Sequence, residues 1–293
     1  FIQKAAEAGK IELRLWKPQE GERRMTAPQE WIKEHIQGAS ALMCTPMNKV
    51  SEEIFEAAGP SLKVVSTMSV GFEHIDREAA KQRGIRVGYT PDVLSPAVAD
   101  VGLLLALNVM RHVLDGMNTV KTGTWLKKPW SPLVGSEMCI RDRLRTSRIS
   151  RHWPSSAMSF CTYTLLTHSL ISTLNASTHH LVDAAFLRAM KPSAYLVNIG
   201  RGPLVDTPAL VEALHKNEIA GAGLDVLEGE PNISADHPLM APELEDKVLV
   251  LPHIASATFE ARFAMGERTA LNVLGGLGLR DDGPADAMPS ELR

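Results

Sequence analysis

The chain is poor in cysteine, has no marked excess of charge of one sign and contains no long apolar run. Its three cysteines (Cys44, Cys139 and Cys161) have neither disulfide nor metal-ligand spacing, so we expect a reducing, cytoplasmic environment and no metal site. Basic and acidic residues are interspersed at a net charge of −3, which argues against nucleic acid or an anionic membrane as a partner. Without a long apolar run no membrane span is expected. Phe1 is not a start methionine, so we expect the true N-terminus and any targeting signal on it to be missing.

The sequence pattern is that of a globular protein, and a length of 293 residues favours two domains over one. Short apolar, β-prone runs alternate with amphipathic segments, which is typical of parallel sheets covered by helices on both faces. We expect strands at 11–16, 41–44, 62–66, 85–87, 194–197, 220–226 and 248–251. We expect helices at 1–8, 26–36 with Thr26 as cap, 51–58, 77–82 after Asp76, 98–113, 184–190 after Asp183, 208–214 after Thr207, and 259–274. The helix 98–113 is apolar nearly all round, which predicts a long buried helix that joins two domains.

The segment 135–178 departs from this regularity. It is rich in Ser, Thr, Arg and His, and neither a helical nor a strand period persists in it. A structureless stretch of this length is improbable inside a compact domain. It is either a disordered insertion or a misassembled or frame-shifted stretch that is not native coding sequence. We favour the second interpretation, because 135–143 resembles a run associated with assembly artefacts.

Three polar residues each follow a predicted strand. Arg201 lies between two glycines after 194–197, Glu230 follows 220–226, and His253 follows 248–251. Ligands bind outside the carboxyl ends of strands in open α/β sheets, although each residue taken singly is more often structural. An imidazole held by a carboxylate is a general acid–base, and a guanidinium grips a carboxylate with two hydrogen bonds. Together the three residues suit a substrate that carries both a carboxylate and a carbonyl group.

In their order and spacing, these three segments resemble the D-isomer-specific 2-hydroxyacid dehydrogenases. The segments 66–71, 83–94 and 288–292 are most similar to the glyoxylate/hydroxypyruvate reductases of that family. The resemblance covers most of 1–134 and 179–293. It implies an α/β fold of two Rossmann-like or flavodoxin-like, doubly wound parallel-sheet domains: a discontinuous substrate (catalytic) domain, 1–93 plus 259–293, and a dinucleotide-binding domain, 94–258. It also implies a homodimer that uses NADPH or NADH to reduce glyoxylate or hydroxypyruvate to the D-2-hydroxy acid.

The resemblance also implies roles for single residues. Arg201 would hold the substrate carboxylate and carbonyl oxygen, His253 would donate the proton, and Glu230 would keep the imidazolium charged and oriented. The amides of Val70 and Gly71 would bind the carboxylate, and Asp225 would accept from the nicotinamide carboxamide. Trp125 or Trp130 would close the pocket, although isolated tryptophans are more often packing residues. The other implied cofactor-binding positions, beside Arg201, Asp225 and His253, are Val98, Asn198, Ile199, Gly200 and Ala255.

One large departure concerns the cofactor. The family places a strand–GxGxxG–helix unit after the Trp-containing segment, and 135–178 stands where it should be. The glycines at 200–202 and 221–223 lack the third glycine, and 275–278 lies near the C-terminus in the wrong context. The dinucleotide-binding domain is therefore expected to be incomplete, and the choice between NADPH and NADH stays open. A catalytically inactive, dinucleotide-sensing or partner-binding relative is the alternative function, and a phosphoglycerate or formate dehydrogenase is a third.

Overall fold

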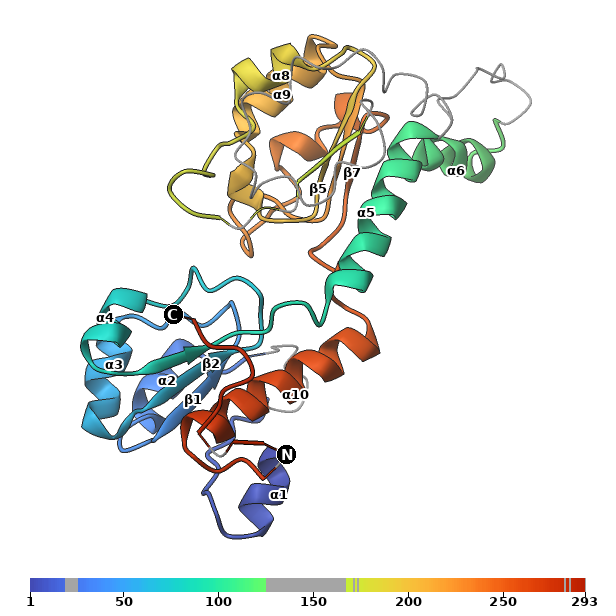
Figure 1. Ribbon diagram of the computed structural model, residues 1–293. Coiled ribbons are helices and arrows are strands. Elements are labelled where there is room, and N and C mark those ends of the chain that lie inside the picture. Colours follow the sequence, from blue (N-terminus) through green and yellow to red (C-terminus); the bar gives the residue numbers. More distant parts are fainter. Residues whose placement is uncertain are drawn as a thin grey trace. The chain divides into compact units, whose positions relative to one another are not determined.

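The computed structural model describes residues 1–18, 26–124, 167–170, 172, 174–281, 283–284 and 286–292. Its contacts divide the chain into two compact units, Phe1–Ser95 with Ala257–Arg293 and Pro96–Ser256. Each unit has one parallel sheet with helices packed against it (Figure 1). The α/β fold class predicted from the sequence is thus confirmed, and the roles expected for the two parts of the chain are taken up below as proposals.

The discontinuous unit has a three-stranded sheet of order β1-β2-β3. Val65 of β2 packs among Ile54 and Phe55, whereas its neighbour Val64 packs against Val273 on the opposite face, because successive side chains of a strand alternate. Both faces of this sheet are therefore covered. Its elements are β1 Ala41–Cys44, β2 Val64–Thr67, β3 Arg86–Gly88, α1 Ile2–Glu7, α2 Gln29–His35, α3 Glu52–Ala58, η1 Gly59–Ser61, α4 Arg77–Gln82 and α10 Phe259–Gly276.

The other unit has a four-stranded sheet of order β4-β5-β6-β7, parallel throughout. All four strands end at the same edge, so the loops that follow them start side by side. Its strands are β4 Thr167–Leu170, β5 Tyr195–Asn198, β6 Gly221–Leu224 and β7 Val248–Val250. Its helices are α5 Ser95–Met110, α6 Val113–Lys121, α8 Ala184–Ala189 and α9 Thr207–His215, with short 3-10 turns η6 Gly202–Leu204, η7 Pro238–Met240 and η8 Pro242–Leu244.

Helices cover both faces of this second sheet (Figure 1). Leu196 of β5 packs with Leu187 of α8 and Leu210 of α9. Val197, the next residue, packs with Leu105 of α5 on the opposite face. A Cβ at residue 223 would lie 3.0 Å from the Leu105 Cβ, so a glycine there lets α5 lie close to β6. The buried strands thus hold the sheet edge rigidly between two helical layers.

Some predicted elements are wrong. Residues 11–16 form no strand, because no neighbouring strand pairs with them within the described residues. The predicted caps Thr26 and Thr207 are also wrong: α2 begins after Pro28 without a side-chain cap, and α9 is capped by Asp206, whose Oδ1 accepts from the Ala209 amide at 3.1 Å. A carboxylate in the N-cap position satisfies an amide of the first turn, and Thr207 is therefore the first helical residue.

The predicted helix 98–113 is two helices. Met110 ends α5, and α6 begins at Val113 after His112 takes a left-handed conformation with φ 47°. The expectation of full burial is wrong as well, because Leu103 of α5 is 62% exposed in this chain. A helix with apolar residues on all sides, such as α5, is therefore not necessarily buried on all sides within its own chain.

The expected irregular segment ends earlier than 178. Residues 167–170 form β4 and pair in parallel with β5, so the chain has resumed its sheet by residue 167. The strand β4 is only four residues long and lies in a Ser- and Thr-rich segment, so its apolar and polar residues show no clear alternation. The sequence pattern therefore did not predict it. The rest of the prediction for this segment, 135–166 with 171 and 173, lies outside the described residues.

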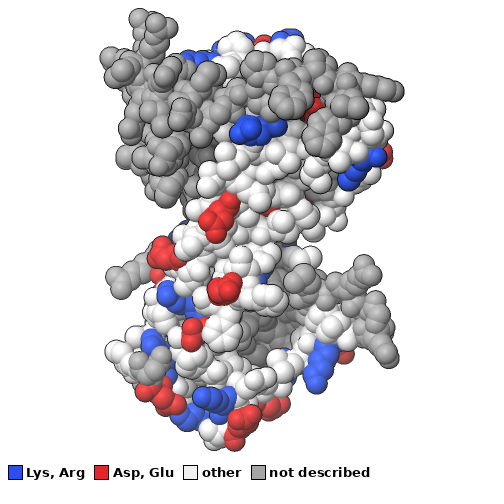
Figure 2. All heavy atoms as spheres, turned by 90° about the vertical axis from the view of Figure 1, so that its right-hand side faces the viewer, with Lys and Arg blue, Asp and Glu red and all other residues white. Residues whose placement is uncertain are grey.

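Two surface properties bear on partners. Among the described residues, no single helix is long and apolar enough to cross a membrane, whereas α5 and α6 together meet that test of length and composition but are bent by 62°. On the face shown in Figure 2, side chains of both signs occur, with wide uncharged areas between them.

Candidate active site

The loop after β5 holds Arg201 at the sheet edge. Asn198, the buried last residue of β5, accepts from the Gly200 amide at 3.1 Å and donates to the Arg201 carbonyl at 2.9 Å. Gly202 follows, and a Cβ there would lie only 2.1 Å from the Leu227 carbonyl carbon and oxygen. A glycine is therefore required for this loop to touch the loop after β6. The half-buried Arg201 guanidinium donates to the Gly200 carbonyl at 2.9 Å.

Asp225 ties the loop after β6 to the loop after β7. Its carboxylate is fully buried, and its two oxygens accept from the amides of Ile254 and Ala255 at 2.8 and 2.9 Å. Its carbonyl accepts from the His253 amide at 2.8 Å. Burial raises the pKa of Asp225, and the two amide donors oppose that rise. The three hydrogen bonds fix the backbone on which the His253 ring stands.

Glu230 and His253 form a hydrogen-bonded pair. The His253 Nδ1 lies 2.7 Å from the Glu230 Oε2, and the other oxygen of that carboxylate accepts from the Leu227 amide at 2.5 Å. The His253 side chain is 45% exposed, and its Nε2 makes no hydrogen bond to the described residues. His253 has a left-handed backbone with φ 53°, a conformation that few residues other than glycine, asparagine and histidine adopt. The pair presents Nε2 to solvent at the sheet edge, as a proton donor requires.

Val70 and Gly71 follow β2 in the discontinuous unit. The Ser69 hydroxyl donates to the Gly71 carbonyl at 2.5 Å, and Thr67 Oγ1 lies 2.9 Å from both the Ser69 hydroxyl and the His74 Nε2. No hydrogen bond within the described part of the chain uses the amide of Val70 or of Gly71. Sequence reasoning missed the supporting network, although its signal was present in two small hydroxyl residues at the end of a buried strand.

The structure also places the remaining predicted positions that fall within its described residues. Val98 of α5 packs in the same cluster as Ile199, and Ala255 is buried behind the His253 loop. Arg201, Asp225, Glu230 and His253 all belong to one unit, whereas Val70 and Gly71 belong to the other. The predicted lids Trp125 and Trp130 lie outside the described residues.

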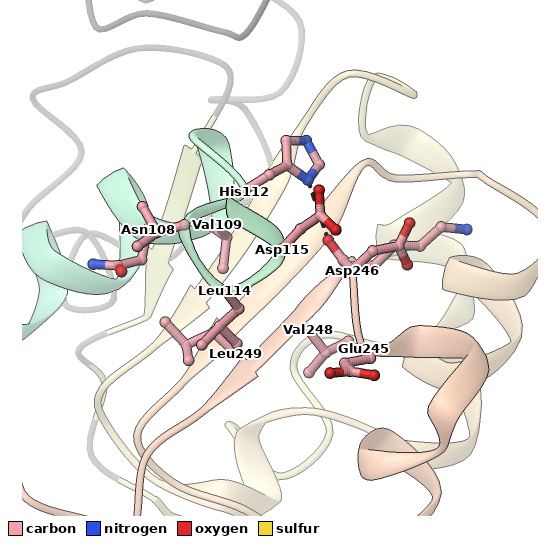
Figure 3. A pocket seen from close by; sticks show the side chains of 11 residues that line it. Asn108, Val109, His112, Leu114, Asp115, Glu245, Asp246, Val248 and Leu249 are labelled. Atoms are coloured by element: carbon pink, nitrogen blue, oxygen red, sulfur yellow. Dashed lines mark hydrogen bonds between the residues drawn. The ribbon is translucent and has the colours of Figure 1, made fainter. Parts of the chain in front are cut away.

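A shallow pocket lies at the other edge of the same sheet. It is lined by residues of α5, α6 and the segment that enters β7, with the His112 Nδ1 3.2 Å from the Asp246 carbonyl oxygen (Figure 3). The pocket lies at the start of β7 and includes its first residues, Val248 and Leu249, whereas His253 follows the end of this strand. In a parallel sheet ligands bind beyond the carboxyl ends of the strands, so this pocket is not the candidate active site.

A parallel α/β sheet with a Glu–His pair and an arginine after its strands is typical of an α/β enzyme, and comparison with known proteins gives the class. Residues 167–255 match the sequence model of the D-isomer specific 2-hydroxyacid dehydrogenase, NAD binding domain. The chain is 40% identical to a glyoxylate reductase of Thermofilum pendens over 278 positions, 84% of this chain and 80% of that protein. It is 33% identical to the human glyoxylate reductase/hydroxypyruvate reductase over 323 positions, 98% of this chain and 93% of that protein.

A solved structure agrees. The NADPH-dependent glyoxylate/hydroxypyruvate reductase of Sinorhizobium meliloti, in complex with NADP and malonate, has a TM-score of 0.67 and 31% identity over 87% of this chain and 84% of that one. The chain therefore belongs to the D-isomer specific 2-hydroxyacid dehydrogenases, a family of NAD(P)-dependent oxidoreductases. The family recognised from the motifs around Arg201, Glu230 and His253 is thereby confirmed.

Proposed function

We propose that this chain reduces glyoxylate or hydroxypyruvate to the corresponding D-2-hydroxy acid, with NADPH or NADH as reductant and His253 as proton donor. The hydrogen bond of 2.7 Å between Glu230 and His253, with Nε2 directed to solvent beside the Arg201 loop, carries the proposal. The names of the curated relatives, which are reductases of glyoxylate or hydroxypyruvate, support the substrate class. The sequence motifs at 66–71 and 288–292 favour it over other members of the family.

The chain's own groups supply binding and proton transfer. Arg201 grips the substrate carboxylate and draws electron density toward the carbonyl oxygen. His253 donates the Nε2 proton to that oxygen, while Glu230 accepts from Nδ1 and stabilises the imidazolium before transfer. The unused amides of Val70 and Gly71 are suited to bind the substrate carboxylate, with the discontinuous unit as substrate domain and 94–258 as dinucleotide-binding domain. Bound NAD(P)H would supply the hydride.

The reacting end of the dinucleotide is proposed to lie against the backbone of the Arg201 and His253 loops. Val98 is half-buried there, and Ile199, Gly200 and Ala255 are small or apolar residues that are buried beneath these loops. Asp225 is expected to accept from the nicotinamide carboxamide through a remaining lone pair, since each oxygen already accepts one amide; because its carboxylate is fully buried, cofactor binding has to expose that lone pair. No GxGxxG loop for the pyrophosphate occurs anywhere in the sequence.

The test uses His253→Asn, because asparagine tolerates the left-handed backbone at this position. NADPH oxidation with hydroxypyruvate should fall by about 10²–10⁴-fold, the usual worth of a general acid, while cofactor affinity stays nearly unchanged. His237→Asn, a loop histidine outside the site, is the matched control and should retain activity. Turnover retained in His253→Asn would exclude His253 as proton donor.

A non-catalytic relative is the second candidate, and the missing glycine loop favours it. The intact set of Arg201, Glu230 and His253 opposes it, since a pure sensor has no need of a paired imidazole at the sheet edge. A folded chain that binds NADPH but oxidises it with neither hydroxypyruvate nor glyoxylate would establish this alternative. Activity that is lost in His253→Asn would exclude it.

We further propose a homodimer formed through α5 and α6. Leu103 and Leu104 of α5 are 62% and 46% exposed, and Met117 and Val120 of α6 are 49% and 59% exposed, which is a costly apolar surface for a monomer. Light scattering should give twice the chain mass, and Leu103→Glu should yield monomers. Met240→Glu, at an exposed apolar residue elsewhere in the unit, is the control. A monomeric parent chain at micromolar concentration would contradict this proposal.

A further inference from the structure

Two histidines and a glutamate converge outside the proposed catalytic set. His179, His180 and Glu228 each offer one metal-ligating atom, and these three atoms lie within 4.8 Å of one another. The His180 Nε2 is 2.9 Å from the Glu228 Oε1, and the two imidazole rings stack with centroids 4.0 Å apart. His180 and Glu228 are both half-buried, with side chains 34% and 31% exposed, whereas His179 is exposed.

The backbone holds the two histidines in place. A turn closed by the Thr178 and His179 amides on the Asn175 carbonyl precedes them. The His180 amide then donates to the Pro203 carbonyl at 2.8 Å, and His180 has a left-handed backbone with φ 50°. Such a conformation persists only where its surroundings fix it. The imidazoles therefore stand on a preorganised segment, anchored to the loop after β5.

We propose that His179, His180 and Glu228 bind a divalent transition-metal ion of the zinc class, through two imidazole nitrogens and one carboxylate oxygen. Imidazole ligands favour zinc and its neighbours, whereas magnesium and calcium take oxygen ligands. Two nitrogens and one oxygen make a three-ligand site, and water would complete the tetrahedron.

The geometry needs little change to accept the ion. Metal–nitrogen distances of about 2.0–2.1 Å place the donors of a tetrahedral site about 3.3 Å apart. The His180 Nε2 and the Glu228 Oε1 are 2.9 Å apart, so they would separate by about 0.4 Å as the metal replaces the proton between them. The three ligand atoms, which lie within 4.8 Å of one another, would also have to draw closer by up to about 1.5 Å, and the exposed His179 side chain has room for that movement.

Asp206 supplies support behind the ligands. Its Oδ2 lies 4.0 Å from the His180 Nδ1, and a shift of about 1 Å would bring the two within hydrogen-bond distance. A carboxylate behind a ligating histidine fixes the ring and raises its basicity. Asp206 is itself held as the N-cap of α9, so the support comes from a rigid element.

The experiment is a zinc titration of the metal-stripped full chain, in competition with a chromophoric chelator. One equivalent should bind with micromolar or tighter affinity. His179→Asn, His180→Asn and Glu228→Gln should each weaken binding at least tenfold, and asparagine tolerates the backbone at His180. His215→Asn, at an exposed histidine on α9, is the matched control and should bind as the parent does. Circular dichroism of each metal-free variant checks that it is folded.

Cobalt substitution separates this site from the cysteines. Cobalt bound by imidazole and carboxylate should show d–d bands without a thiolate charge-transfer band, and the spectrum should be lost in His180→Asn. Equal zinc affinity in His180→Asn and His215→Asn would overturn the proposal, as would a thiolate spectrum or the lack of a one-equivalent site. Zinc affinity and the cobalt spectrum do not depend on catalysis, so they test the metal site independently of the proposed reductase activity.

Discussion

Replacing Asp225 tests how the His253 loop is built. In Asp225→Asn the side chain keeps its shape, but it has one carbonyl oxygen for the two amides of Ile254 and Ala255. Its NH₂ group then faces one of these amides, donor against donor. Two buried donors then lack an acceptor, at about 1–3 kcal/mol each, and relief of the buried charge offsets part of that cost. We expect a net destabilisation of about 1–3 kcal/mol.

The measurement should be local, because the chain has two units and need not unfold in one transition. Hydrogen exchange of the peptide 251–256, followed by mass spectrometry, should accelerate in Asp225→Asn by about 10–100-fold, which corresponds to the expected loss. Asp236→Asn, at an exposed position, is the control and should leave exchange unchanged. Unchanged protection of 251–256 in Asp225→Asn would refute the role of this carboxylate as the anchor of the loop.

The same variant has a pH signature. Burial raises the pKa of Asp225 above its value in the unfolded chain, so the folded state binds this proton more tightly. The resulting stabilisation is complete below the unfolded value of about 3.9 and is lost as the pH rises through the folded pKa. The stability advantage of the parent over Asp225→Asn should therefore be larger near pH 4 than near pH 7. The opposite trend in urea denaturation would contradict the burial argument.

Three further substitutions or reactions test other parts of the structure. Arg201→Lys should raise the KM for hydroxypyruvate at least tenfold, because lysine lacks the two-pronged guanidinium; a nearly unchanged KM would remove the gripping role. Gly202→Ala should destabilise by about 1–3 kcal/mol or more, because its Cβ meets the Leu227 backbone, whereas the control Gly266→Ala on α10 meets nothing within 4 Å and should stabilise slightly; thermal melts decide. Cys44 is buried with its pKa raised to about 12, so iodoacetamide should label it only after unfolding, and labelling of the native chain would contradict that burial.

Local signals sufficed where one segment determines its own structure. The strand 41–44 and the caps Asp76 and Asp183 were predictable, because apolar runs and N-cap carboxylates act within a few residues. The loops of Arg201, Glu230 and His253 were predictable as strand ends. Their mutual contacts were not, because the distance between Glu230 and His253 depends on the register of β6 with β7.

Contacts between residues far apart in the chain could not be predicted from the sequence either, because they also depend on how the strands and loops pair. His180 and Glu228 are 48 positions apart and show no ligand spacing. They meet because Val182 pairs with Val205, which lays the histidine segment beside the loop after β5, and that loop in turn touches the loop after β6 at Gly202 and Leu227. Likewise, nothing in the composition of 98–113 showed that α5 packs one face on the sheet and leaves Leu103 and Leu104 exposed, because apolar residues occur nearly all round this segment.

A last prediction concerns how this chain binds the dinucleotide without a GxGxxG loop. The alignment with the human relative has 323 positions and covers 98% of this 293-residue chain, or about 287 residues, so about 36 positions of that relative meet no residue here. A βαβ unit takes upwards of about 30 residues, so the number of unpaired positions is large enough for one such unit. The chain has the residues proposed for the nicotinamide end, whereas its sequence has no GxGxxG loop for the pyrophosphate.

The two halves of the cofactor can be separated in a binding assay. Reduced nicotinamide mononucleotide lacks the adenosine half, and the fluorescence of its dihydronicotinamide ring reports binding as it does for NADH and NADPH. If the pyrophosphate cradle is absent, all three should bind within about tenfold of one another, a difference below about 1.4 kcal/mol. NADH or NADPH bound at least a hundredfold more tightly than the mononucleotide would show that another part of this chain cradles the pyrophosphate, and the inference from the missing glycines would be wrong. A repaired chain that carries the strand–GxGxxG–helix unit is the positive control, because its helix N-terminus restores the anion site.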